Sequence, residues 1–195
     1  MIMSKRILIV DDEESIVESL TLILSHANYI VDSCYDGLSA INKYDEEVYD
    51  LILLDIKMPK MDGLEVLDRI LAKNSEQLII MISGHGNIET AVEATKKGAY
   101  NFLEKPLPDI PELLVTIRNA LEFKQSKDEL SKYKKELIES NRLIGNSAKI
   151  QNVRDLIDKF KDLDLNVLIT GESGTGKLLV ANQIHFNSNR SENPF

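Results

Sequence analysis

The sequence predicts an α/β fold: a doubly wound parallel sheet of five strands, followed by a long helical linker and a fragment of a second α/β domain. Two observations lead to this prediction. Short apolar runs alternate with amphipathic segments along the first part of the chain. Runs such as LILL and LIIMI are apolar at every position, as expected of strands buried on both faces. Five strand–helix repeats of this kind predict a parallel sheet covered by helices on both sides.

The expected strands and helices begin close to the N-terminus. Strands are predicted over Arg6–Val10, Tyr29–Cys34, Leu51–Leu54, Leu78–Ile82 and Ala99–Leu103. Helices are predicted between them, over Glu14–His26, Gly37–Glu46, Gly63–Lys73 and Asn87–Lys97. In the first helix, Ile16, Leu20 and Ile23 fall on one face, which predicts a helix packed on the sheet.

A fifth helix is predicted to begin near Asp109–Glu112, because acidic residues and Pro111 favour a helix N-terminus. After Ala120 the chain is highly charged and has no proline or glycine before Gly145, so the helix is expected to continue as a linker. Its apolar residues recur every seven positions, at Phe123, Leu130, Leu137 and Ile144, with Tyr133 on the neighbouring seam position. This heptad pattern favours pairing with a second copy of the chain. A solvated helix lying alone is the alternative.

A second pattern begins near Leu143. Ser147–Phe160 is predicted to be a helix and Leu165–Thr170 a strand, followed by a glycine-rich turn and another helix. One strand and two helices cannot form a doubly wound core, so we expect a domain that continues past Phe195. The predicted boundaries are 4–122 for the first domain, 123–142 for the linker and 143–195 for the incomplete domain.

Charge and cysteine content limit the classes of function. Among 195 residues, 23 Lys and Arg stand against 32 Asp and Glu, a net charge of −9. This acidity argues against nucleic-acid binding by charge, so no direct DNA binding is expected. The single cysteine, Cys34, excludes an internal disulfide framework, fits a reducing cytoplasm and is expected to be a small core residue. No apolar stretch has the length of a signal peptide or membrane span, so we expect a cytoplasmic protein.

Chemically suitable side chains follow four of the expected strands. Asp11 and Asp12 follow the first strand, Asp55 the third, Ser83 the fourth and Lys105 the fifth. Ligands of doubly wound sheets bind outside the carboxyl ends of the strands. Converging carboxylates suit Mg²⁺, and a carboxylate such as Asp55 can act as a nucleophile toward phosphorus while Lys105 neutralises charge. Each residue alone has an ordinary explanation, such as helix capping. The five together predict a phosphoryl-transfer site.

The runs ILIVDDE, LILLDIKMPKMDG, MISGHG and FLEKP resemble the receiver domain of two-component response regulators, over roughly residues 4–123. The resemblance implies a flavodoxin-like sheet of strand order 2-1-3-4-5. It also implies that a sensor histidine kinase phosphorylates Asp55, with Ser83 and Lys105 assisting. A Mg²⁺ site is implied at Asp11, Asp12, Asp55 and the backbone carbonyl of Lys57.

The same resemblance implies a switch. Ser83 would move toward the phosphoryl group and Phe102 would turn inward, which changes the surface of the fourth helix, fifth strand and fifth helix. A static core residue is the alternative for Phe102. Lys57 and His85 match variable positions beside the site, although a loop histidine is more often simply solvated. The resemblance also implies a cis peptide bond before Pro106.

GESGTGK, at Gly171–Lys177, follows an expected strand and precedes an expected helix, the context of a phosphate-binding loop. The candidate nucleotide-binding residues are Gly171, Gly174, Thr175, Gly176 and Lys177. ATP is therefore a candidate ligand. Leu178 stands where such loops usually carry Ser or Thr, so a hydroxyl for Mg²⁺ is absent and metal binding there is in doubt.

Residues 143–195 resemble the start of the AAA+ ATPase domain of NtrC-like activators of sigma-54 RNA polymerase. Two functions follow as alternatives: a phospho-receiver that forms homodimers through its linker or receiver face, or an ATP-hydrolysing transcription activator. Hydrolysis needs elements that sense the γ-phosphate and activate water, which this stretch lacks. We therefore expect the receiver function and no enzyme activity of the chain by itself, with sigma-54 RNA polymerase a partner of a complete activator. A naturally truncated regulator is the less favoured origin.

Overall fold

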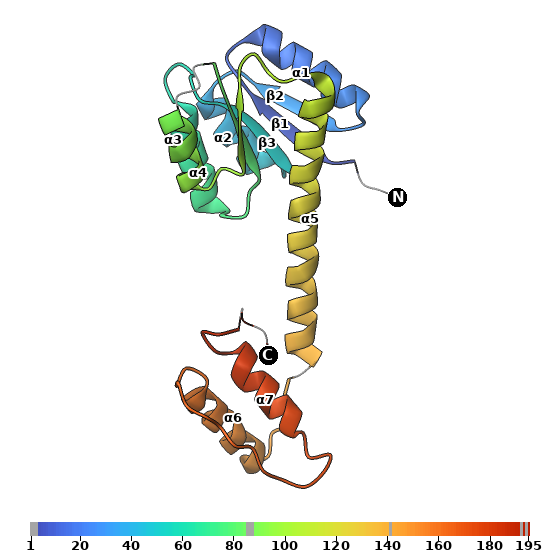
Figure 1. Cartoon of the computed structure of the whole chain (residues 1–195), viewed down its shortest axis with the longest axis vertical. Coiled ribbons are helices and arrows are strands. Elements are labelled where there is room, and N and C mark those ends of the chain that lie inside the picture. The colour runs from blue at the N-terminus through green and yellow to red at the C-terminus, as the bar shows by residue number, and fades with distance from the viewer. Residues whose placement is uncertain (1–3, 85–87, 141, 192, 194) are drawn as a thin grey trace. The chain divides into compact units, whose positions relative to one another are not determined.

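The computed structural model describes residues 4–84, 88–140, 142–191, 193 and 195. They form two compact units, the first ending at Gln125 and the second beginning at Ser126. The first unit contains the sheet, and the second contains two further helices (Figure 1). No helix in the described part of the chain is both long enough and apolar enough to cross a lipid bilayer.

A parallel sheet of five strands lies at the centre of the first unit. The strands are β1 (Arg6–Val10), β2 (Ile30–Cys34), β3 (Leu51–Asp55), β4 (Ile79–Ser83) and β5 (Asn101–Glu104). Their order is β2-β1-β3-β4-β5, and every neighbouring pair is parallel. The predicted strand order is therefore confirmed, with strand ends that differ from the predicted ones by at most a few residues.

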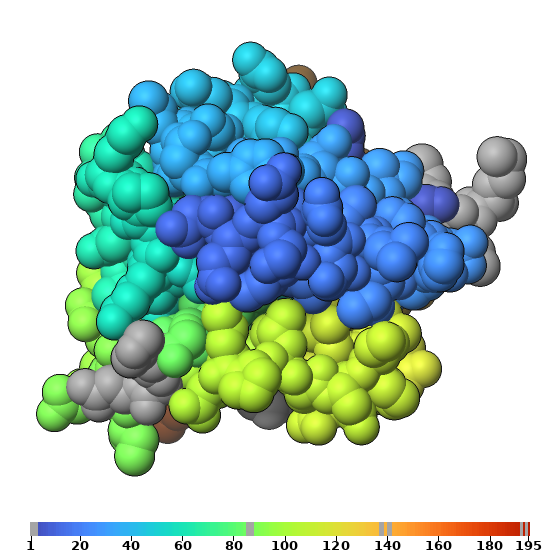
Figure 2. All heavy atoms as spheres, turned by 90° about the horizontal axis from the view of Figure 1, so that it is seen from above, coloured from blue at the N-terminus to red at the C-terminus, as the bar shows by residue number. Residues whose placement is uncertain are grey.

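Helices cover both faces of this sheet (Figure 1). They are α1 (Glu14–His26), α2 (Gly37–Glu46), α3 (Gly63–Lys73), α4 (Ile88–Lys97) and α5 (Ile110–Ser140). Side chains alternate along a strand: Ile7 and Ile9 pack with α1 and α5, whereas Leu8 and Val10 pack with α2, α3 and α4. In Figure 2 the blue α1 and the yellow-green start of α5 lie side by side. Cys34 belongs to the core as expected, and burial raises the pKa of its thiol to about 12.

Two helices of the α2–α4 side begin with an aspartate that caps them. Asp36 accepts a hydrogen bond from the Ser39 N–H at 2.9 Å, and Asp62 accepts one from the Glu65 N–H at 2.8 Å. Such caps satisfy N–H groups that have no partner within the helix. In α1 the N-cap residue is Glu13, whose side chain makes no capping hydrogen bond.

The long helix α5 joins two different environments. Leu113, Ile117 and Leu121 are buried against the sheet, whereas the described apolar side chains from Phe123 onward are exposed. Phe123 is the first of these, and its ring lies 5.4 Å from that of Tyr100, centroid to centroid. The start of α5 is thus held by the core, and the rest of the helix extends beyond it.

The predicted heptad pattern does not fit the helix at its end. α5 ends at Ser140, so Ile144 lies outside it and cannot occupy a helical seam. The side chain of Leu137 lies outside the described part of the structure.

The second unit contains α6 (Ala148–Phe160) and α7 (Lys177–Phe186). Ser147 caps α6 by accepting a hydrogen bond from the Ile150 N–H at 3.3 Å. The predicted strand at 165–170 is wrong: these residues form no strand. A strand needs a neighbour to pair with its N–H and C=O groups, and no described residue of this unit forms one. Leu165 and Leu168 consequently remain exposed.

Candidate functional site

Four strands deliver polar side chains to one edge of the sheet. Asp11 follows β1, Asp55 ends β3, Ser83 ends β4 and Lys105 follows β5. The strands are parallel, so their carboxyl ends meet at the same edge. Asp11, Asp55 and Ser83 are buried there. The predicted residues therefore converge from positions far apart in the sequence.

The ammonium group of Lys105 lies among three carboxylates. Its Nζ is 2.8 Å from Asp55 Oδ1, 2.9 Å from Asp11 Oδ2 and 2.8 Å from Glu13 Oε1. The backbone N–H of Lys105 donates to the Ser83 carbonyl at 2.8 Å, which ties this segment to the end of β4. The peptide bond between Lys105 and Pro106 is cis, as the resemblance implied.

Burial and neighbouring charges shift the protonation of the site. Burial raises the pKa of Asp55; the hydrogen bond with Lys105 opposes this shift, and the charge of Asp11 adds to it, so that the pKa ends above its usual range. Burial lowers the pKa of Lys105, but the hydrogen bonds to its carboxylate partners outweigh that effect and raise it. The Asp55 anion is therefore less stable than in water and would gain from additional positive charge nearby.

The predicted metal ligands are only partly brought together. Asp12 is exposed, and Lys105 lies between Asp11 and Asp55. Consistent with this, no three Asp, Glu, His or Cys side chains among the described residues are grouped to hold a metal ion. Asp11 Oδ2 is nevertheless buried and, although close to Lys105 Nζ, receives no well-directed hydrogen bond. A buried carboxylate oxygen without such a bond is a ligand that suits Mg²⁺, so the residue types fit this ion.

The other predicted receiver residues lie around this centre. Phe102, in β5, is half-buried and packs against the core on the α2–α4 side. Lys57 is exposed, and its backbone N–H donates to the Asp55 carboxylate. His85 lies outside the described residues.

Two residues that the sequence patterns did not single out are part of the site. Glu13 forms an ion pair with Lys105. The sequence feature that could have indicated this role is a glutamate at the N-cap position of a helix, where Ser, Thr, Asp or Asn is preferred. Gly63, the first residue of α3, touches the backbone of Asp55: a Cβ there would lie 2.0 Å from the Asp55 carbonyl oxygen. The sequence feature that could have indicated this role is a glycine at the expected start of a helix, because glycine is unfavourable within helices.

The second predicted site is the glycine-rich turn before α7. Gly174 and Gly176 have φ angles of 78° and 83°, in the left-handed region that favours glycine. Gly176 is the N-cap residue of α7, which Lys177 begins. Lys177 Nζ donates to the Gly171 carbonyl at 3.0 Å and also to the Glu172 carbonyl. The loop thus has positive-φ glycines and a helix N-terminus, the features that phosphate-binding loops use.

The residue that follows Lys177 does not fit a metal ligand. Leu178 is 68% exposed in the first turn of α7 and has no side-chain oxygen. The Thr175 hydroxyl donates to the Glu172 carbonyl at 2.7 Å, within the loop itself. The residues present therefore suit a phosphate group better than Mg²⁺ at this loop.

Two known protein families match the stretches of the chain that contain these two sites. Residues 7–118 match the response regulator receiver domain, and residues 143–195 match the sigma-54 interaction domain. The chain belongs to the response regulator family. The second match, over residues 143–195, is to the sigma-54 interaction domain, and the relatives that the chain resembles over both matched stretches include regulatory proteins.

Relatives of this response regulator are much longer proteins. The nitrogen assimilation regulatory protein NtrX of Azorhizobium caulinodans is 40% identical over 195 residues, which cover 99% of this chain and 42% of NtrX. The regulatory protein AtoC of Escherichia coli is 33% identical over 193 residues, which cover 97% of this chain and 42% of AtoC. The crystal structure of NtrX from Brucella abortus matches with a TM-score of 0.71 at 38% identity, and the match covers 99% of this chain and 42% of the NtrX chain. Two other structures of that NtrX are complexes with ADP and ATP.

Proposed function

We propose that Asp55 of this response regulator accepts a phosphoryl group from a sensor histidine kinase. The observation that carries the proposal is the 2.8 Å contact between a buried Asp55 oxygen and the Lys105 ammonium, with Ser83 at the end of the adjacent strand. This arrangement supplies a nucleophilic oxygen, a positive charge for the transferred group and a hydroxyl beside it.

The proposed chemistry is an in-line transfer. An Asp55 carboxylate oxygen attacks the phosphorus and forms a P–O bond, while the bond from phosphorus to the histidine nitrogen of the kinase breaks. Lys105 stabilises the charge on the transferred oxygens, and the Ser83 hydroxyl donates a hydrogen bond to one of them. Mg²⁺, when bound, supplies further charge neutralisation. Its proposed ligands are Asp11, Asp12, Asp55 and the backbone carbonyl of Lys57.

The proposed output is a change in self-association. β4 and β5 are neighbours, with Ser83 paired to Glu104 and Met81 to Phe102, so a shift of Ser83 toward a phosphoryl group can be passed to Phe102. The receiver face around α4, β5 and α5 would change with it. A homodimer would use this face or the exposed apolar residues of α5, among them Phe123 and Leu130.

For the longer protein, we propose control of sigma-54-dependent transcription in the cytoplasm. The match of residues 143–195 to the sigma-54 interaction domain supports this role. In this proposal, residues 4–122 form the receiver domain, 123–142 the linker and 143–195 an incomplete AAA+ domain. This chain alone would neither contact DNA directly nor hydrolyse ATP.

ATP binding at Gly171–Lys177 is a second candidate function. The left-handed glycines and the helix that begins at Lys177 favour it, as do the ADP and ATP complexes of NtrX from Brucella abortus. Because Leu178 offers no oxygen, we propose that any nucleotide is held chiefly through its phosphates by the loop and Lys177.

The phosphorylation proposal is tested by incubating the chain with acetyl phosphate and Mg²⁺ and measuring its intact mass. We expect the mass of one added phosphoryl group, and none in Asp55→Asn. Asp50→Asn is the matched control: Asp50 precedes β3 at the opposite edge of the sheet, where it pairs with Lys5, and this variant should still be phosphorylated. Equal phosphorylation of Asp55→Asn would refute the assignment.

A further inference from the structure

A side chain that the family resemblance did not assign contacts the central ammonium of the receiver site. Glu13 Oε1 lies 2.8 Å from Lys105 Nζ, so Lys105 has a third carboxylate partner besides Asp11 and Asp55. The backbone N–H of Glu13 donates to Asp11 Oδ1 at 2.9 Å. The segment after β1 therefore holds Glu13 beside the site through its backbone as well as its side chain.

The side chain of Glu13 does not cap the helix that it begins. Glu13 is the N-cap residue of α1, and its backbone carbonyl accepts hydrogen bonds from the first turn, but its side chain accepts none. Asp36 and Asp62, by contrast, cap α2 and α3 through their side chains. Glutamate is not among the residue types that cap well. The side chain instead forms an ion pair with Lys105, which points to a role in the site rather than in the stability of α1.

The three carboxylates differ in how readily they can release Lys105. The side chains of Asp11 and Asp55 are 0% and 3% exposed, whereas that of Glu13 is 57% exposed. An ammonium group has three N–H donors, and three carboxylate oxygens already surround this one. Exposed ion pairs are weak because water screens them. Glu13 is therefore the partner that leaves when another anion approaches Lys105.

We propose that Glu13 is a positioning residue that competes with the phosphoryl group for Lys105 and thereby slows phosphorylation of Asp55. This inference rests on the function proposed above. Before transfer, Glu13 helps to hold the ammonium group. As the phosphoryl oxygens reach Asp55, Lys105 exchanges Glu13 for them, and the Glu13 carboxylate moves into solvent without forming or breaking a covalent bond.

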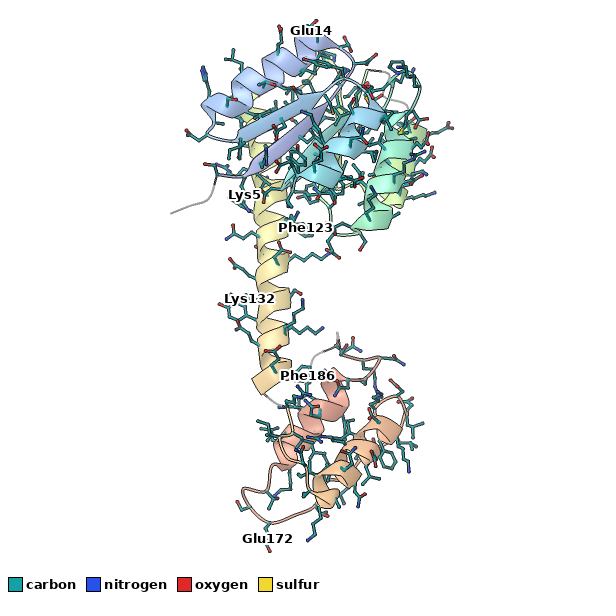
Figure 3. The ribbon with its side chains drawn as sticks, turned by 180° about the vertical axis from the view of Figure 1, so that it is seen from behind. Lys5, Glu14, Phe123, Lys132, Glu172 and Phe186 are labelled. Carbon is teal, nitrogen blue, oxygen red and sulfur yellow. The ribbon has the colours of Figure 1, made fainter. Side chains whose placement is uncertain are left out.

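The test compares phosphorylation rates by acetyl phosphate, measured by intact mass, for the unaltered chain and two variants. We expect Glu13→Gln to react about two- to fivefold faster at low ionic strength, the effect of removing one exposed ion pair. The difference should shrink as salt is added, and the rate at which the phosphoryl group is lost should not change. Glu14→Gln removes the same charge from the next residue, at the beginning of α1 (Figure 3), and should react like the unaltered chain.

Each alternative outcome contradicts the inference in a recognisable way. A structural role for Glu13 predicts slower phosphorylation and a lower melting temperature in Glu13→Gln. Equal rates in this variant and the unaltered chain, or equal acceleration in Glu14→Gln, would show that the contact with Lys105 does not compete. If the unaltered chain takes up no phosphoryl group, the proposed function fails and the inference with it. If only the comparison of variants fails, the proposed function stands.

Discussion

At the scale of single residues, Asp55 occupies an environment that opposes its own charge. It is buried beside Asp11, and Lys105 is shared among three carboxylates rather than devoted to Asp55. The raised pKa of Asp55 reflects this balance. Functional sites commonly keep such unfavourable arrangements because the reaction relieves them. Cation binding would do so here, since a positive charge beside Asp55 offsets both the cost of burial and the repulsion from Asp11.

The first prediction is that Asp55→Asn stabilises the fold. A folded-state pKa above the unfolded one means that Asp55 contributes stability below its unfolded pKa, and that this contribution is lost as the pH rises through the folded pKa. At pH 7 the ionised group therefore costs stability. Neutral Asn removes that cost, and urea denaturation should show a gain on the order of 1 kcal/mol at pH 7. The gain should disappear in acid, where Asp55 is protonated in both states.

Asp50→Asn is the control for this stability measurement. Asp50 accepts hydrogen bonds from Lys5 Nζ at 3.0 Å and from the Arg6 backbone N–H at 2.8 Å. Removing its charge weakens these bonds, so the variant should be no more stable than the unaltered chain. A loss of stability in Asp55→Asn would contradict the view that Asp55 is destabilised as an anion.

The second prediction concerns Leu178, which lies next to Lys177 at the start of α7. Without a side-chain oxygen at this position, binding of a fluorescent ADP analogue should hardly depend on Mg²⁺. Leu178→Ser supplies a hydroxyl, so Mg²⁺ should tighten binding to this variant about tenfold, equivalent to roughly 1.4 kcal/mol. Leu179→Ser, one residue farther along, should show no such gain. Strong Mg²⁺ dependence in the unaltered chain would indicate that another group binds the metal.

At the scale of elements, the junction between β3 and α3 determines where Asp55 lies. The Gly63 N–H donates to the Ile56 carbonyl at 2.8 Å, and Asp62 caps the helix. These contacts bring the start of α3 directly against the end of β3. The position of Asp55 therefore depends on backbone packing as well as on its own side-chain partners.

The third prediction is that Gly63→Ala destabilises the fold by roughly 2 to 4 kcal/mol. The added Cβ would lie 2.0 Å from the Asp55 carbonyl oxygen, a backbone atom that cannot move without distorting β3. Urea denaturation measures the loss, and phosphorylation by acetyl phosphate should fall as well. Gly84→Ala is the control, since its Cβ would come no closer than 3.7 Å, to the Lys105 side chain. Unchanged stability in Gly63→Ala would mean that α3 can shift freely.

The exposed part of α5 is the second element with a testable role. Leu130 is 69% exposed and Tyr133 is also exposed, although both are apolar enough to be buried between paired helices. If α5 pairs with a second copy, Leu130→Gln should weaken the dimer about tenfold or more, because one buried leucine contributes roughly 1.5 to 3 kcal/mol. This is the fourth prediction, and sedimentation equilibrium measures the dimer dissociation constant that tests it. Lys132→Gln, at the charged position labelled in Figure 3, should have little effect, and equal dimerisation of all forms would favour a solitary helix.

At the scale of the whole molecule, the receiver fold could be predicted because its signals are local. Apolar runs such as Leu51–Leu54 form strands wherever the rest of the chain covers both faces, and residues directly after them must lie at one edge of a parallel sheet. Asp11, Asp55 and Lys105 were predicted on this basis, and the structure brings both carboxylates within hydrogen-bonding distance of the Lys105 ammonium group.

Features that depend on distant partners could not be predicted in this way. The run LNVLIT has the composition of a strand, but without a described neighbouring strand it forms none. The contact between Glu13 and Lys105 depends on the reach of one side chain across the edge of the sheet. The crowding at Gly63 arises only when α3 folds back onto β3. Patterns within one segment contain no information on such contacts.

The fifth prediction tests whether the receiver controls assembly of the whole chain. Mg²⁺ with beryllofluoride mimics an aspartyl phosphate, so it should change the molar mass measured by light scattering if phosphorylation alters the α4–β5–α5 face or the pairing of α5. Asp55→Ala should abolish the change, whereas Leu130→Gln should abolish it only if α5 forms the interface. A change that survives in Asp55→Ala would separate assembly from phosphorylation. An unchanged mass, with beryllofluoride binding confirmed separately, would instead favour a receiver that signals by docking to another protein.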